Sequence, residues 1–371
     1  MANRDTSLDD RVHSFKDLQH YGSERMTKAC RDYYNEGSMD LITVRLNESA
    51  YDRYMIRPRV LRNTSNLDPS TTIFGTKVKF PFGISPTAMQ TLAHPEGENG
   101  VSKGCAKSDT LMALSSYSTI ELEKVISHRQ INPYVMQISL LKSKPAMIQM
   151  IRRAEVAGYN ALFVILDCPY LGRRLNEYRN KFNLPAGTSF PNFFPGVDVA
   201  NLQDGDETMS YDDTIEWPEI IPFFREHTSM EIWAKGIYTV EDALLAVESG
   251  FNGIIVSNHG GRQLDGVPAT LDALREIVPD IKGKVPIAID GGIRRGSDIF
   301  KALAIGADFC MAGRPALWSL AYNGEEGVKL AIDLLYRESV LCMGLSGCRT
   351  ISDISSASLS ILENNGRLSK L

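Results

Sequence analysis

Eight short apolar runs, rich in β-branched residues, recur along the 371-residue chain, and each is followed by a helix-like stretch. The runs begin near residues 81, 111, 134, 162, 231, 253, 285 and 308. Six of the seven spacings lie between 22 and 32 residues, enough for one strand, one helix and two short loops. Continuous apolar runs are typical of parallel strands that are buried on both faces. The pattern predicts an α/β fold, a (β/α)8 TIM barrel; a doubly wound open sheet is the alternative.

The stretches between these runs carry helix signals. In the segment 239–250, apolar residues recur at helical spacing, Thr239 is placed to cap the first turn, and Gly250 is placed to end the helix. The segment 143–158 follows the same rules, with Pro145 in its first turn.

Two regions fall outside the repeat. The predicted division is an N-terminal helical segment packed on the barrel (1–75), the barrel itself (76–355) and an exposed C-terminal tail (356–371). Helices are expected near 14–20 and 24–36. The 69-residue gap after the fourth run contains a loop, 183–217, rich in Pro, Gly, Asn and Asp. We expect this loop to lie over the C-terminal mouth of the barrel.

Composition excludes several classes of partner. The chain has 40 Lys and Arg against 45 Asp and Glu, a net charge of −5, which argues against nucleic acid or an anionic membrane surface as a partner. No apolar run is long enough to predict a transmembrane helix. The six cysteines form no CxxC pair, so reduced thiols in an intracellular setting are expected, and no metal site is predicted.

Polar and charged residues follow the predicted strands at the end where TIM barrels place their active sites. In chain order they are Pro86–Gln90, Ser115–Tyr117, Gln137 with Ser139, Asp167 with Arg173 and Arg174, Lys235, Ser257–Asp265, Asp290–Gly296 and Ala312–Pro315. A Lys, a His, two Asp and several Arg are therefore expected at one mouth.

The ends of the last two strands predict a phosphate site. Gly292 and Gly313 would let the backbone approach a ligand closely, and Arg294 and Arg314 would supply positive charge. The alternative is that the glycines serve only to form turns.

His259 is the best candidate for a general base, because the ordinary pKa of histidine lies near neutrality. A structural loop histidine is the alternative. Asp167 could orient the ring, and Arg262 and Arg174 could hold an anionic carboxylate by bidentate contacts. Lys235 is either a solvated rim residue or a buried cation that stabilises charge on a cofactor.

These segments resemble a known family. SNHGGRQLDG, DGGIRRGSDIFKALAIGA and AGRP, together with PTAMQ, LGRR and LSGCR, resemble the FMN-dependent 2-hydroxy-acid oxidases and dehydrogenases, such as glycolate oxidase and lactate oxidase. The resemblance runs in collinear order from about Asp32 to Ile354. It implies the oxidation of a 2-hydroxy acid to a 2-oxo acid, with O2 reduced to H2O2.

The resemblance also implies a role for each residue. His259 takes a proton from the substrate and pairs with Asp167, Arg262 and Arg174 bind the substrate carboxylate, and Tyr33 lines the substrate site. The residues implied to bind FMN are Pro86, Thr87, Ala88, Ser115 and Gln137 at the ring, Lys235 and Ser257 beside it, Asp290 at the ribityl chain, and Gly292, Arg294, Gly313 and Arg314 at the phosphate.

Three positions depart from the family pattern. The family commonly has a tyrosine where this chain has Ser139, a threonine at Ile165 and, in glycolate oxidases, a tryptophan at Tyr117. Ser139 leaves more room and lacks the phenol, so the expected substrate is larger than glycolate or different from it. An oxidase of a specialised, secondary-metabolism intermediate, acting on a C–N bond, is the alternative on the same fold.

The chain ends in Ser369-Lys370-Leu371, which is a peroxisomal address read by an import receptor. A peroxisomal location, or otherwise a cytoplasmic one, is therefore expected, and the resemblance implies a homo-oligomer. Two rivals from other classes stay open at this point. One is a phosphate-binding barrel without redox activity, and the other is a catalytically inactive interaction protein.

Overall fold

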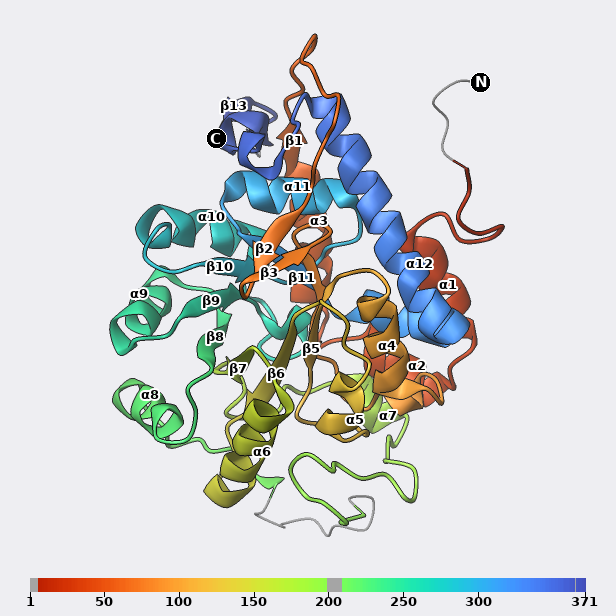
Figure 1. Ribbon diagram of the computed structural model, residues 1–371, viewed down its shortest axis with the longest axis vertical. Coiled ribbons are helices and arrows are strands. Elements are labelled where there is room, and N and C mark those ends of the chain that lie inside the picture. The colour runs from red at the N-terminus through yellow and green to blue at the C-terminus, as the bar shows by residue number, and fades with distance from the viewer. Residues whose placement is uncertain (1–5, 199–208, 364) are drawn as a thin grey trace.

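A computed structural model describes residues 6–198, 209–363 and 365–371. Eight parallel strands close into a barrel in the order β10-β11-β4-β5-β6-β7-β8-β9 (Figure 1). The strands are β4 (Phe82–Ile84), β5 (Leu111–Leu114), β6 (Tyr134–Ser139), β7 (Ala161–Ile165), β8 (Glu231–Ile237), β9 (Gly253–Val256), β10 (Ile287–Ile289) and β11 (Phe309–Ala312). Each predicted run contains one of them, so the predicted TIM barrel is confirmed and the open sheet was wrong.

Helices cover the barrel on the outside (Figure 1). They are α4 (Gly97–Ala106), α5 (Leu122–Ile126), α6 (Lys144–Ala157), α8 (Trp217–Arg225), α9 (Val240–Ser249), α10 (Thr270–Ile281), α11 (Gly296–Ile305) and α12 (Arg314–Ser346). The predicted caps of α9 are confirmed. The Thr239 side chain accepts a hydrogen bond from the backbone of Asp242, and Gly250 adopts a left-handed conformation after the last turn.

A hairpin closes the N-terminal end of the barrel. Its strands β2 (Thr71–Ile73) and β3 (Thr76–Val78) are joined by Phe74 and Gly75, whose φ values are 49° and 70°. The Phe74 ring lies 5.2 Å from the ring of Trp233, measured between centroids, and packs against the apolar cluster inside the barrel. The hairpin therefore covers the end of the barrel opposite the mouth that the strand ends form.

The N-terminal segment contains the two expected helices, α1 (Phe15–Glu24) and α2 (Lys28–Asn35), and two elements that were not anticipated. These are helix α3 (Ile42–Arg53) and strand β1 (Tyr54–Ile56). Helix α1 packs along α12 (Figure 1).

Part of the predicted C-terminal tail pairs into a small sheet, whereas its last residues are largely exposed. Strand β12 (Leu359–Leu362) pairs antiparallel with β1, and β13 (Leu368–Lys370) pairs with β12. Leu359 is fully buried, although β13 remains at the edge of this sheet. Backbone pairing with β1 holds this polar segment, so its composition alone did not reveal it.

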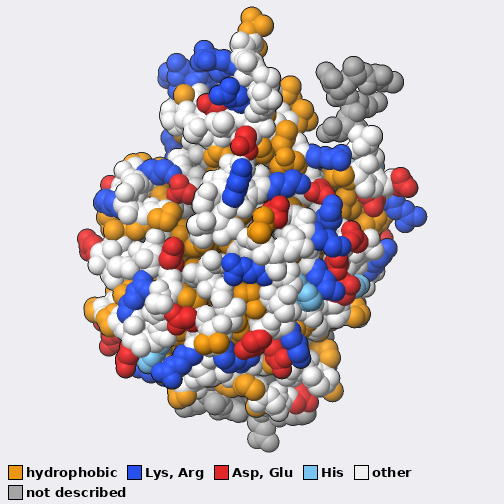
Figure 2. Space-filling view, in the orientation of Figure 1, with side chains coloured by type: hydrophobic (Ala, Val, Ile, Leu, Met, Phe, Trp, Pro, Cys, Tyr) orange, Lys and Arg blue, Asp and Glu red, His pale blue; other side chains and the backbone are white. Residues whose placement is uncertain are grey.

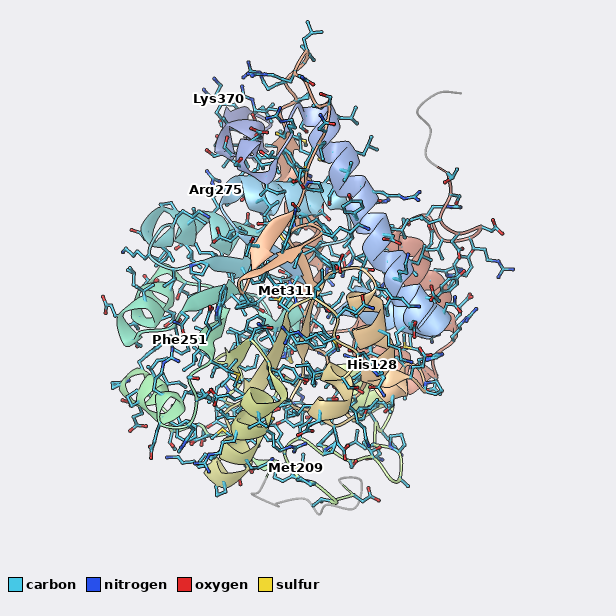
Figure 3. All side chains as sticks on the ribbon, viewed as in Figure 1. His128, Met209, Phe251, Arg275, Met311 and Lys370 are labelled. Atoms are coloured by element: carbon cyan, nitrogen blue, oxygen red, sulfur yellow. The ribbon has the colours of Figure 1, made fainter. Side chains whose placement is uncertain are left out.

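The long loop after β7 lies across the C-terminal mouth, as expected. Its described part includes a short helix, α7 (Leu175–Arg179). The side chains of Phe190 and Phe193, which belong to this loop, are buried. Residues 199–208 of the predicted loop lie outside the described residues. Met209 and Lys370 lie at opposite ends of the molecule (Figure 3).

On the face shown in Figure 2, acidic and basic side chains are interspersed, and Lys and Arg gather at the end that carries the C-terminal sheet. Such mixing is ordinary for a solvated surface. Among the described residues, no helix has the length and apolar character needed to cross a bilayer.

Two helical glycines should respond oppositely to Ala. In α1, a Cβ on Gly22 would lie 2.1 Å from the carbonyl oxygen of Trp318 in α12. In α12, a Cβ on Gly344 would meet nothing closer than 3.8 Å. Urea denaturation should show that Gly22→Ala destabilises the protein by about 1–3 kcal/mol because it forces the helices apart. Gly344→Ala should stabilise it by about 0.5–1 kcal/mol. Equal effects would contradict this packing.

Candidate active site

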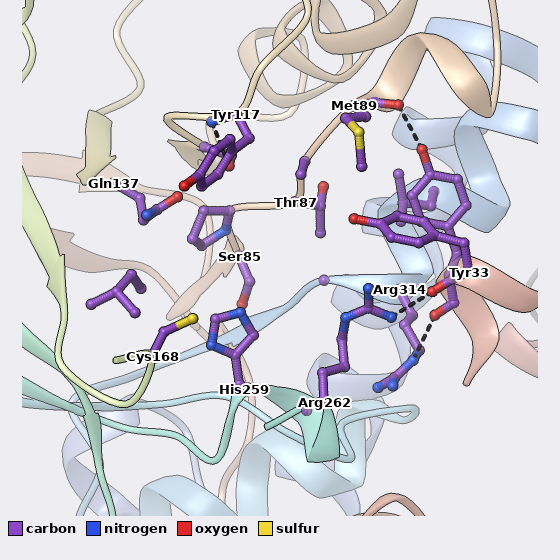
Figure 4. Close-up of a pocket in the computed structure, with 18 of the residues that line it drawn as sticks. Tyr33, Ser85, Thr87, Met89, Tyr117, Gln137, Cys168, His259, Arg262 and Arg314 are labelled. Atoms are coloured by element: carbon purple, nitrogen blue, oxygen red, sulfur yellow. Dashed lines mark hydrogen bonds between the residues drawn. The ribbon is translucent and has the colours of Figure 1, made fainter. Parts of the chain in front are cut away.

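A cavity of about 510 Å³ opens at the C-terminal ends of the barrel strands. The predicted residues that line it are Tyr33, Pro86, Thr87, Ala88, Ser115, Gln137, Ser139, Arg174, Lys235, His259, Arg262, Asp290, Gly292, Arg294, Gly313 and Arg314. Asp167 and Ser257 lie behind this lining and contact two of its members, His259 and Lys235. Residues from distant parts of the sequence thus converge on one mouth (Figure 4).

His259 begins a 3-10 turn, η4 (His259–Gly261), directly after β9. Its Nδ1 lies 3.2 Å from Oδ1 of Asp167, which follows β7. Burial alone would raise the pKa of Asp167, but the adjacent His259 and Lys235 hold it below its ordinary value. The carboxylate therefore stays ionised at neutral pH and fixes the ring, while Nε2 is left for the cavity.

A buried cluster joins the ends of β8, β9 and β10. Nζ of Lys235 donates to Oγ of Ser257 at 2.8 Å and lies 3.1 Å from Oδ2 of Asp290. Ser85 Oγ donates to the same Oδ2 at 3.3 Å. Oδ1 of Asp290 is buried and has no partner among the described residues. A buried acceptor of this kind calls for a hydroxyl or amide donor from a ligand.

Two arginines and two glycines form the predicted phosphate end. Arg314 donates to the carbonyl oxygens of Tyr34 and Glu36, at 3.0 and 2.9 Å. Burial and the neighbouring arginines Arg262 and Arg294 lower the pKa of Arg314 to about 9. A nearby anion would stabilise this cation.

The other members of this end also fit a close ligand. Arg294 pairs with Glu48 at 2.7 Å, and its Nε is buried with no partner among the described residues. Gly292 has a φ of 79°, and a Cβ there would lie 1.8 Å from the carbonyl oxygen of Asn47. Only glycine therefore fits this turn, which explains one of the predicted glycines by packing as well as by ligand approach.

The predicted carboxylate-binding arginines lie next to this end. Arg262 donates to the carbonyl oxygen of Glu36 at 3.2 Å, the same oxygen that accepts from Arg314. Nε of Arg174 donates to the carbonyl oxygen of Arg262 at 3.4 Å, and its Nη1 pairs with Glu177 at 3.2 Å. The Arg262 guanidinium lies 4.8 Å from the centroid of the Tyr33 ring. Burial, together with Arg174, lowers the pKa of Arg262 to about 10. This part of the cavity is therefore cationic and suits an anionic substrate group.

Strand β6 and the end of β5 supply neutral polar groups. The backbone N–H of Ser116 donates to Gln137 Oε1 at 3.2 Å, and Gln137 Nε2 donates to Ser139 Oγ at 3.1 Å. Ser115 Oγ accepts from the backbone of Tyr117 at 3.1 Å. Ile165, which replaces the commoner threonine, also lines the cavity.

Sequence reasoning missed the support behind the catalytic turn. Asn47 of α3 and Asn258, next to His259, exchange two side-chain hydrogen bonds of 2.8 and 2.9 Å. Both side chains are buried. This amide pair fixes the position of the turn that carries His259. No local pattern links two asparagines so far apart in the sequence.

Several cavity residues were also missed. From the long loop come Phe182, Leu184, Phe190, Met209 and Tyr211, and Cys168 follows Asp167 at the end of β7. The only usable signal was the length of the loop after the fourth strand, which predicted a cover but not its contacts.

Comparison with known proteins decides the family. The sequence pattern of the FMN-dependent dehydrogenases matches residues 22–361. The chain belongs to the FMN-dependent dehydrogenase family. It is an FMN-dependent oxidoreductase of the 2-hydroxy-acid oxidase type, as the sequence resemblance predicted.

The curated relatives of this family member include two kinds of oxidase. It is 50% identical over 367 residues to Oxidase FUB9 of Fusarium oxysporum f. sp. lycopersici, covering 98% of this chain and 95% of that protein. It is 40% identical over 353 residues to glycolate oxidase of Spinacia oleracea, covering 93% and 94%. A solved structure of mandelate oxidase with (S)-2-phenylpropionate superposes with a TM-score of 0.85 at 32% identity, covering 97% of this chain and 100% of that one.

The cavity fits FMN on its own chemistry. The buried Oδ1 of Asp290 lacks a donor, which a ribityl hydroxyl would supply. Arg314 and Arg294 place positive charge where the Gly292 turn admits a phosphate. Lys235 lies buried beside the space left for the ring.

The phosphate end gives a prediction for cofactor binding. A phosphate dianion would accept charge-assisted hydrogen bonds from Arg314. Arg314→Met removes this cation and should weaken FMN binding roughly 10- to 100-fold at pH 7.

Quenching of flavin fluorescence measures the effect, and riboflavin, which lacks the phosphate, is the control ligand. Riboflavin should bind alike to both proteins. If Arg314→Met weakened riboflavin and FMN equally, Arg314 would not be a phosphate ligand.

Proposed function

We propose that this chain oxidises a 2-hydroxy acid to the 2-oxo acid, with O2 as the acceptor and H2O2 as the second product. The observation that carries the proposal is the pairing of His259 with Asp167, 3.2 Å apart, in a mouth that also holds Arg262 and Arg174. This combination places a proton acceptor beside an anion site, which is what a hydroxyl next to a carboxylate requires.

FMN, when bound, accepts two electrons from the substrate and delivers them to O2. The protein positions the substrate and moves its proton. Arg262 and Arg174 hold the substrate carboxylate, which orients C2 toward the cofactor space. Tyr33, stacked on Phe182 with centroids 4.8 Å apart, limits that end of the cavity.

His259 accepts the proton that leaves the substrate through Nε2. Its Nδ1 faces Asp167, whose lowered pKa keeps it ionised, so the imidazolium that forms is stabilised by an adjacent negative charge. Lys235 stabilises negative charge that develops at the cofactor, and Asp290 and Ser257 hold the Lys235 ammonium in place.

A second candidate is oxidation of a specialised intermediate at a C–N bond. The higher identity to Oxidase FUB9, 50%, than to glycolate oxidase, 40%, is consistent with this candidate. Ser139, Ile165 and Tyr117, the three positions that depart from the family pattern, all line the cavity. The proton acceptor and anion site described above would serve this substrate equally.

We further propose a peroxisomal location and a homo-oligomer. The terminal Ser369-Lys370-Leu371 supports import by the peroxisomal receptor, and one relative, from Arabidopsis thaliana, is named peroxisomal (S)-2-hydroxyacid oxidase GLO4. Lys370 lies on the edge strand β13, away from the active site.

His259→Gln tests the proposed chemistry. The variant keeps a polar side chain but cannot accept the proton, so H2O2 formation from 2-hydroxy acids should fall about 10²- to 10⁴-fold while bound FMN is retained. His128→Gln, outside the cavity, is the matched control and should retain wild-type activity (Figure 3). The substrate panel contains glycolate, lactate, mandelate, 2-hydroxyoctanoate and a cyclic amino acid.

The substrate panel distinguishes the two candidate reactions, and the variant tests the role of His259. Peroxide from the cyclic amino acid alone would favour the second candidate. Unchanged activity of His259→Gln would remove this histidine from the mechanism.

A further inference from the structure

The long loop after β7 returns to the barrel beside the end of β6. The backbone N–H of Lys142 donates to the carbonyl oxygen of Ser210 at 3.0 Å, and that of Asp212 donates to Leu140 at 3.0 Å. These two bonds form an antiparallel bridge between Leu141 and Tyr211. The loop therefore behaves locally as a short strand that is paired to the extension of β6.

This bridge brings Tyr211 next to the end of β6. Ser139 is the last residue of β6, two residues before Leu141. Ser139 and Tyr211 both line the cavity.

The Tyr211 ring faces a second phenol. Its centroid lies 6.4 Å from that of Tyr117, which packs edge-on against Phe190 at 5.3 Å. Burial, with Tyr117 and Cys168 nearby, raises the pKa of Tyr211 well above its ordinary value. Burial also raises the pKa of Tyr117, although hydrogen bonds with Tyr211 and Ser139 act to lower it. Both phenols are therefore protonated hydrogen-bond donors at neutral pH.

Contacts outside the cavity hold this part of the loop in place. Oη of Tyr170 donates to Asp213 Oδ2 at 2.7 Å, and Lys142 lies 3.7 Å from Asp213 Oδ1. Asp213 is thus fixed from two sides, one residue beyond Asp212 and two beyond Tyr211. Tyr211 therefore lies on a segment of the loop that these contacts hold in place.

We propose that Tyr211 is a specificity-determining residue that donates a hydrogen bond to the substrate where strand β6 carries only Ser139. The inference rests on the proposed function and names its substrate class. Arg262, Arg174 and Tyr211 bind the polar end of the substrate. Apolar side chains form the adjoining wall, and these are Met89, Leu184, Phe190 and Met209. The substrate is therefore a 2-hydroxy acid with an apolar substituent larger than a methyl group.

Tyr211→Phe removes the hydroxyl and keeps the ring. Loss of a hydrogen bond to a charged group should lower kcat/KM for 2-hydroxyoctanoate roughly 10- to 100-fold. It should also weaken oxalate, a non-reacting dicarboxylate, by a similar factor, measured from the shift of flavin absorbance on binding. Tyr178→Phe removes a hydroxyl from the same loop at an exposed site outside the cavity, and should change neither value.

A swap separates the position of the phenol from general damage to the loop. Ser139→Tyr alone adds a ring next to Tyr117 and Tyr211, and should lower activity by overpacking. Ser139→Tyr combined with Tyr211→Ala places a tyrosine on β6 and removes the tyrosine on the loop. This double variant should exceed both single variants in kcat/KM, with FMN content and urea midpoint showing that all three are folded.

The two proposals fail in different ways. If no 2-hydroxy acid reduces the wild-type flavin, the proposed function is wrong, and oxalate binding still tests Tyr211. If wild type is reduced but Tyr211→Phe matches it in kcat/KM and in oxalate affinity, Tyr211 does not determine specificity. A double variant no better than Tyr211→Ala would also contradict the inference.

Discussion

Eight parallel strands that close on themselves must all end at the same rim. The Phe74 hairpin covers the other end, and the ligand-binding groups gather at that rim. Every functional group discussed here depends on this constraint. The buried cluster of Lys235, Ser257 and Asp290 joins the ends of three neighbouring strands. The closed barrel thereby fixes the positions of these charged groups.

The electrostatics of the mouth explain its ligands. Arg262, Arg174, Arg294 and Arg314 lie within one cavity, and burial lowers the pKa of two of them. Guanidinium groups held so close together, and facing backbone carbonyls as much as carboxylates, are stabilised by added negative charge. The cofactor phosphate and the substrate carboxylate supply it. Cofactor and substrate thus complete a site whose charges are arranged in advance.

The barrel could be predicted because each strand is buried on both faces and reads as a continuous apolar run. The Gly–Arg turns after β10 and β11 were also visible, because close backbone approach and positive charge leave a local trace. Three features left no local pattern in the sequence. The Asn47–Asn258 amide pair joins residues far apart, β12 is held by pairing with β1 rather than by its own composition, and Tyr211 lies in a loop without periodicity. Each depends on tertiary contacts that no window of sequence contains.

The most direct test of 2-hydroxy-acid oxidation at this mouth is a single anaerobic turnover with a 2-hydroxy acid that carries either hydrogen or deuterium at C2. The substrate should bleach the visible absorbance of the flavin, more slowly with deuterium, and oxygen should restore the colour. A flavin-loaded protein that no 2-hydroxy acid bleaches, or whose bleaching is followed by no recovery in oxygen, would contradict the assignment of this mouth to 2-hydroxy-acid oxidation.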